Sequence, residues 1–196
     1  MDQSNATLRR RGLRLEYATL GWNVIGVVVV LAAALAARSV ALAGFGLDSG
    51  IEIVASLVVV WQLTGAATPD RERRALRLIG TAFLALAAYV LVQSTVTLAT
   101  RAHPHRSPVG VAWLAATFLV MLALAGGKGR TGRALGSPVL QTEARVTLVD
   151  AYLAGSVLAG LVGNAALGWW WADPVAALVI VYYGVREGRA ALSGGG

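Results

Sequence analysis

Two acidic residues stand four positions apart within an apolar stretch of this 196-residue chain. The stretch runs from about Val40 to Leu63, and its acidic residues are Asp48 and Glu52. If the stretch is helical, the two side chains share one face at a separation of about 6 Å. A charged carboxylate deep in a bilayer costs on the order of 2.5–3.5 kcal/mol, and folding alone requires no such pair. Two neighbouring carboxylates supply the oxygen ligands of a divalent cation.

Three interpretations of this acidic pair are compatible with its spacing. We favour a divalent cation held between the carboxylates, because two like charges on one helix face repel each other unless a cation lies between them. In the second interpretation, the acids relay protons without a metal. In the third, the pair is structural: the acids pair with Arg38, or they face a polar cavity as one protonated and one ionised acid.

A third acidic residue, Asp150, lies in another apolar stretch, from about Val146 to Leu167. If Asp150 converges on Asp48 and Glu52, the three carboxylates form a three-ligand site, with water or the transported ion in the fourth position. A fourth candidate ligand is Glu143, seven residues before Asp150 on the same helical face. A solvated charge at the end of the helix explains Glu143 equally well.

The elements that must position these acids follow from the composition. Hydrophobic residues make up 57% of the chain and charged residues 14%, against about 45–50% and about 25% in soluble domains. A soluble domain of this size cannot bury so much apolar surface, and the chain has no cysteine for a disulfide scaffold. Six helices of about 20 residues would need roughly 120 residues. We therefore expect an all-α, six-helix membrane bundle with spans at about 17–36, 40–63, 79–98, 109–125, 146–167 and 175–185.

The basic residues indicate how these spans are oriented. With both chain ends on one side, that side receives 14 of the 17 basic residues, and the other side receives Arg38, Arg101 and Arg106. The positive-inside rule then places both ends in the cytoplasm. The prediction is a multi-pass protein of the cell membrane, with a transmembrane domain at 17–185 and cytoplasmic segments at 1–16 and 186–196. The net charge of +7 is explained by orientation, so no nucleic-acid partner is expected.

The loops are expected to be polar linkers. They include a segment from Thr68 to Arg74 and a basic, glycine-rich segment from Gly126 to Gly136, which contains Lys128. His103 and His105 flank Pro104 in another loop and are expected to be solvated rather than to bind a metal. No nucleotide-binding loop, HExxH motif or nucleophile elbow is present, so we expect neither an enzyme nor transport driven directly by ATP.

Three segments together resemble the transmembrane domain of the cation diffusion facilitator, or cation efflux, family. The segment from Ser39 to Glu52 is similar to the second-span motif, in which two ligands stand four residues apart. The segment from Glu143 to Asp150 resembles the fifth-span site, where the family places His-x-x-x-Asp. The segment Trp171-Ala-Asp-Pro-Val-Ala-Ala-Leu-Val-Ile180 resembles the signature that opens the sixth span.

The resemblance implies that Asp48, Glu52 and Asp150 occupy ligand positions. Val146 stands where the family has its fifth-span histidine, which leaves an all-oxygen site. Such a site favours harder ions such as Mg²⁺ and Mn²⁺ over zinc. The cytoplasmic metal-binding domain that usually follows the sixth span is not found in the short segment after Val185.

The resemblance also implies a function and partners. The expected function is divalent-cation efflux by alternating access, with zinc, manganese, iron or cobalt as the cation and protons as the counter-transported ion. The expected partners are the lipid bilayer and a second copy of the chain in a homodimer. The alternative is a non-transporting membrane scaffold of the same fold, which the absent histidine and absent cytoplasmic domain favour.

Overall fold

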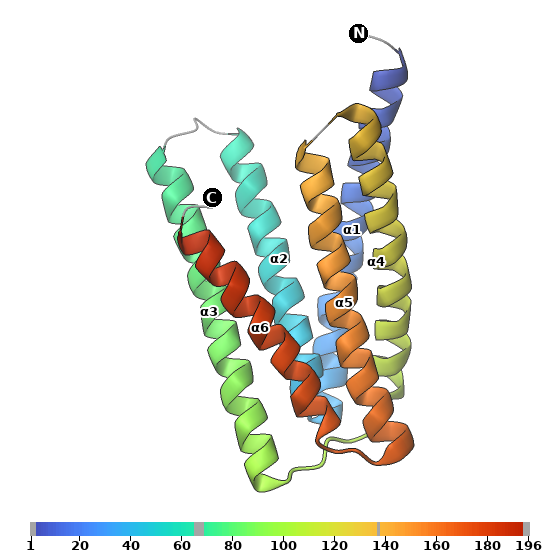
Figure 1. Ribbon diagram of the computed structural model, residues 1–196, viewed down its shortest axis with the longest axis vertical. Helices are drawn as coiled ribbons and strands as arrows, with labels where there is room; N and C mark the ends of the chain where they lie inside the picture. The colour runs from blue at the N-terminus through green and yellow to red at the C-terminus, as the bar shows by residue number, and fades with distance from the viewer. Residues whose placement is uncertain (1–2, 65–68, 137, 194–196) are drawn as a thin grey trace.

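The chain folds into long α-helices joined by short connections (Figure 1). The computed structural model describes the backbone of residues 3–64, 69–136 and 138–193, and the side chains of these residues apart from 3–5, 9, 55–64, 69–73, 75, 76, 79, 138, 139, 142, 143 and 145. The helices are α1 (Gln3–Ala37), α2 (Val40–Thr64), α3 (Pro69–Thr100), α4 (Pro108–Leu135), α5 (Pro138–Leu167) and α6 (Ala172–Leu192). The all-α prediction is confirmed.

The helices alternate in direction along the bundle, so that α1 begins and α6 ends toward the same end, the upper one in Figure 1. Helix α1 packs on α2 and α4, and α4 packs on α5. The pair α3 and α6 packs together, and α6 also contacts α5. Helix α2 contacts α1, α3, α5 and α6. Its central place explains why a side chain on α2 meets one on α5.

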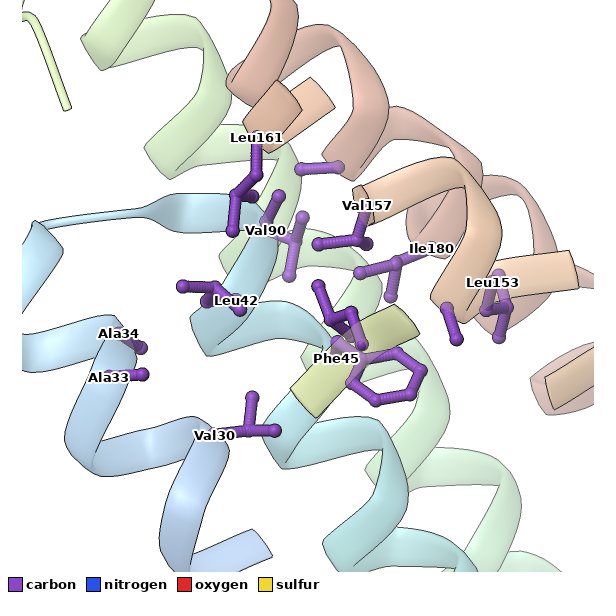
Figure 2. Packing of buried hydrophobic residues seen from close by; sticks show 14 of the residues in the cluster. Val30, Ala33, Ala34, Leu42, Phe45, Val90, Leu153, Val157, Leu161 and Ile180 are labelled. Carbon is purple, nitrogen blue, oxygen red and sulfur yellow. The ribbon is translucent and has the colours of Figure 1, made fainter. Parts of the chain in front are cut away.

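The buried core is built around the first half of α2. Figure 2 shows Leu42 and Phe45 of α2 surrounded by side chains from neighbouring helices. These neighbours are Val30, Ala33 and Ala34 of α1, Val90 of α3, Leu153, Val157 and Leu161 of α5, and Ile180 of α6. Packing on all sides holds α2 in a defined rotation, which sets the direction in which its acidic residues point.

Within the described residues, four helical segments are long and apolar enough to cross a membrane: Ala6–Ala37, Gly80–Thr100, Pro108–Leu135 and Val146–Leu167. Helix α6 carries Asp173, Arg186, Glu187 and Arg189 within its 21 residues. With these charges it is too polar to count among the four apolar segments. The chain is thus a multi-pass membrane protein. The full count of six spans, the domain boundaries, the cell membrane and the cytoplasmic location of both ends stay predictions.

The prediction of a glycine-rich linker at Gly126–Gly136 is wrong. Helix α4 continues to Leu135 and ends at Gly136, whose φ of 58° gives a left-handed cap. Gly127 faces α1 and Gly132 faces α5, where an added Cβ would lie 3.0 Å from the Gln141 backbone nitrogen. Small residues here permit close helix packing. Lys128 is consequently a helical residue with 1% of its surface exposed, and not a loop charge.

Helices α5 and α6 approach each other closely at Gly160, and this contact generates a prediction. A Cβ there would lie 2.7 Å from the Ala176 Cβ and 2.9 Å from the Ala172 carbonyl oxygen. Gly160→Ala is expected to force the helices apart and to destabilise the protein by about 1–3 kcal/mol, measured by thermal unfolding in detergent. The matched control is Gly21→Ala in α1, where an added Cβ would meet no other side chain or helix within 4 Å in the described part of the chain. This control should stabilise the protein slightly, since alanine favours helix. An equal effect of the two substitutions would contradict the close contact.

Candidate metal centre

The start of α2 is anchored to the start of α6. Ser39 precedes α2, and its Oγ accepts a hydrogen bond from the Leu42 N–H at 3.1 Å, as an N-cap residue does. Asp173 of α6 accepts hydrogen bonds from the Val40 N–H at 3.1 Å and the Ala41 N–H at 3.4 Å. Its other carboxylate oxygen accepts one from the Ser39 hydroxyl. Asp173 thereby satisfies free N–H groups of α2 and places a negative charge at the positive end of the helix dipole.

This anchor fixes the position of α2 two turns before its acidic pair. Sequence reasoning included Asp173 in the sixth-span signature but gave it no role. The available signal was an acid beside Pro174 at a helix start, followed by an apolar run. Its partner could not be identified without the tertiary structure, because Ser39 lies 134 residues away in the chain.

Asp48, Glu52 and Asp150 come together between α2 and α5. One carboxylate oxygen of each residue lies within 4.8 Å of the others. Asp48 is 4% exposed and Asp150 is 2% exposed, while Glu52 is partly buried. A cation at about 2.0–2.2 Å from each ligand oxygen holds those oxygens roughly 3–4 Å apart. Small side-chain rotations are therefore enough to bring the three acids to coordination distance.

The buried acids of this cluster have unused acceptor atoms. Asp48 Oδ2 and Asp150 Oδ1 are inaccessible to solvent and have no hydrogen-bond partner in the described part of the chain. Arg38 is exposed in the turn between α1 and α2, and no ion pair joins it to either acid among the described residues. Unsatisfied, buried carboxylate oxygens are costly, so their chemistry suits a positively charged ligand.

The other residues considered from the sequence are Glu143, Val146, His103 and His105. The side chain of Glu143 lies outside the described residues, so its role stays a prediction. Val146, where the resemblance implies histidine, is apolar and 46% exposed, and contributes no ligand. His103 and His105 are exposed. The His103 ring lies 5.4 Å from that of Trp170, away from the acidic cluster.

A buried cation beside the cluster was missed by the sequence reasoning. Lys128 Nζ lies 2.8 Å from Glu16 Oε2 of α1 and donates a hydrogen bond to Thr147 Oγ1 of α5 at 3.2 Å. Thr147 stands three residues before Asp150, on the same side of α5. Because Lys128 and Asp150 carry opposite charges, they attract each other across Thr147. Lys128 is the one lysine of the chain. The glycines around it indicate a linker, and a lysine in a linker is expected to be solvated rather than part of a site.

A comparison with protein families decides the assignment. The family model described as the cation efflux transmembrane domain matches residues 76–193, more than half of the chain. The chain belongs to the cation efflux family. The match includes Asp150 and the α6 anchor Asp173, and it begins after Asp48 and Glu52. Because this is a family of transporters and not of enzymes, the cation efflux protein is assigned to cation transport across a membrane.

Substitutions of Asp173 and Asp48 are expected to change the thermal stability of the protein in opposite directions. Asp173→Ala removes the acceptor of two α2 N–H groups and should lower the melting temperature, with a loss of about 1–3 kcal/mol. Asp48→Asn removes a charge from a cluster of acids and should raise the melting temperature of the metal-free protein, by on the order of 1 kcal/mol in stability. Thermal unfolding in a chelator-containing buffer measures both. Destabilisation by Asp48→Asn would indicate a structural role for this acid.

Proposed function

We propose that this cation efflux protein transports a divalent metal cation held by Asp48, Glu52 and Asp150. The observation that carries the proposal is the approach of the three carboxylates to within 4.8 Å of one another, with two of them buried. Three acids supply up to three negative charges, which a monovalent ion balances less well than a divalent one. No fold requirement explains why two helices would direct acids at each other in an apolar interior.

The ligand chemistry supports a hard divalent cation. All three groups are carboxylates, and Val146 offers no nitrogen ligand at the position where the family resemblance implies histidine. Oxygen ligands suit Mg²⁺ and Mn²⁺, whereas zinc, cobalt and iron bind more strongly when imidazole is present. We therefore propose Mn²⁺ as the first cation to test, with Zn²⁺, Co²⁺ and Fe²⁺ beside it.

Protons provide a means of release in this proposal. A carboxylate that gains a proton loses its charge and most of its affinity for a cation. Rocking of the helices that opens the cluster to the outside admits protons, and these displace the cation. Cation efflux is then coupled to proton entry by alternating access. The homodimer expected from the family resemblance stays a prediction.

The non-transporting scaffold is the second candidate, and Val146 is the observation that favours it. A site with one ligand fewer binds cations more weakly, and a relative that has lost binding retains only its fold and its partners. Cation binding by the purified protein separates the two candidates directly, because a scaffold needs none.

Cation binding should depend on each of the three acids. In isothermal titration calorimetry of the purified full chain with MnCl₂, Asp48→Asn, Glu52→Gln and Asp150→Asn should each weaken binding by at least about tenfold, since each removes a charged ligand. The double variant His103→Ala, His105→Ala is the control and should bind as the wild type does. Binding that survives all three acid substitutions would place the site elsewhere, and a wild type that binds none of the four cations would favour the scaffold.

Transport should follow the proton gradient. In liposomes loaded with Mn²⁺ or Zn²⁺ and containing the reconstituted protein, cation flux out of the liposomes should rise when protons flow inward down their gradient. It should fall several-fold when a protonophore abolishes that gradient. Asp48→Asn should reduce the flux to the level of empty liposomes. A flux that is unaffected by the protonophore would exclude proton coupling while leaving cation transport intact.

A further inference from the structure

Lys128 is a buried positive charge shared by three helices. It belongs to α4 and is 1% exposed, and its ammonium contacts Glu16 of α1 and Thr147 of α5. Transfer of an ammonium group out of water carries a large penalty unless opposite charges and hydrogen bonds offset it. A methionine of similar volume would join the three helices without this penalty. Helix packing alone therefore does not account for a lysine at this position.

The ion pair with Glu16 does not cancel the field of Lys128 in every direction. Glu16 Oε2 lies 2.8 Å from the ammonium on the α1 side, and Glu16 Oε1 is inaccessible to solvent. On the α5 side, the ammonium contacts the neutral hydroxyl of Thr147 at 3.2 Å. Because little water screens this interior, the positive charge still acts on charged groups beyond Thr147.

The field of the Lys128 ammonium acts on the cluster of Asp48, Glu52 and Asp150. Thr147, which accepts the hydrogen bond from Lys128, lies three residues before Asp150, or about 4.5 Å along α5. The two α5 residues are on the same side of the helix, and both are buried. Lys128 and Asp150 carry opposite charges and attract each other, whereas Asp150 and Asp48 carry like charges and repel each other.

We propose that Lys128 sets the cation affinity of the Asp48–Glu52–Asp150 cluster by acting as its resident positive charge. When the cluster is empty, the ammonium balances part of the negative charge. When a divalent cation is bound, the ammonium repels it and weakens the binding, which favours release. Glu16 moderates this effect by partly neutralising Lys128. The inference rests on the proposed function, because it concerns the affinity of that same site.

Two substitutions that break the same ion pair should change affinity in opposite directions. Lys128→Met removes the repelling charge and should tighten Mn²⁺ binding by on the order of tenfold. Glu16→Gln leaves the ammonium unbalanced and should weaken Mn²⁺ binding several-fold. A purely structural ion pair predicts the same direction for both variants, or no change in either. Lys128→Arg retains the charge and should lie closer to the wild type than to Lys128→Met.

The measurement is calorimetric titration of the purified full chain with MnCl₂, alongside thermal unfolding without metal to verify folding. In liposomes, Lys128→Met should lower both the KM and the maximal rate, because a more tightly held cation leaves more slowly. If Lys128→Met does not fold, weaker binding by Glu16→Gln with near-wild-type binding by Lys128→Arg still supports the proposal. Shifts of Lys128→Met and Glu16→Gln in the same direction, or unchanged affinity in Glu16→Gln, would overturn it while leaving the metal site in place. A wild type without Mn²⁺ binding would overturn both.

Discussion

A charged group placed in an apolar interior needs an opposite charge or hydrogen bonds, and the buried charges of this protein meet that need in different ways. Asp173 accepts hydrogen bonds from the free N–H groups that begin α2. Lys128 is paired with Glu16 across α1 and α4. Asp48 and Asp150 each retain a buried oxygen without a partner in the described part of the chain. The Asp173 arrangement completes the fold, and the acidic cluster leaves a demand for positive charge.

The arrangement of helices follows from how these charges are held. The Asp173 contact ties the start of α2 to α6, and the Leu42 and Phe45 side chains fix its rotation within the core. From this anchored start, two helical turns lead to Asp48 and a third leads to Glu52. Small residues on α4 and α5 allow these helices to pack closely. Close packing carries Lys128 and Asp150 toward the same region of the interior.

The sequence alone predicted the local features well. The apolar stretches predicted helices, and the i, i+4 spacing predicted that Asp48 and Glu52 share a face, because both properties depend on neighbouring residues. The approach of Asp150 was a hypothesis, since it depends on the packing of α5 against α2. The burial of Lys128 within a helix was not predicted, because glycine indicates either a flexible linker or a close helix contact. Four glycines between positions 126 and 132 suggested the first, and the tertiary structure has the second. The site roles of the acids, including Glu143, stay predictions.

The short connection after α4 has a consequence for any motion of the bundle. Helix α4 ends at Leu135 and α5 begins at Pro138, and the two helices pack against each other. We expect two helices joined and packed in this way to move as one rigid body. Lys128 belongs to α4 and Asp150 to α5, so the distance between them is preserved when this pair moves. Asp48 and Glu52 belong to α2, so the distance from these two residues to Asp150 is the one that changes when the pair moves. In the proposed transport cycle, movement of this pair would therefore open the acidic cluster from the α5 side while Asp150 keeps its distance from Lys128.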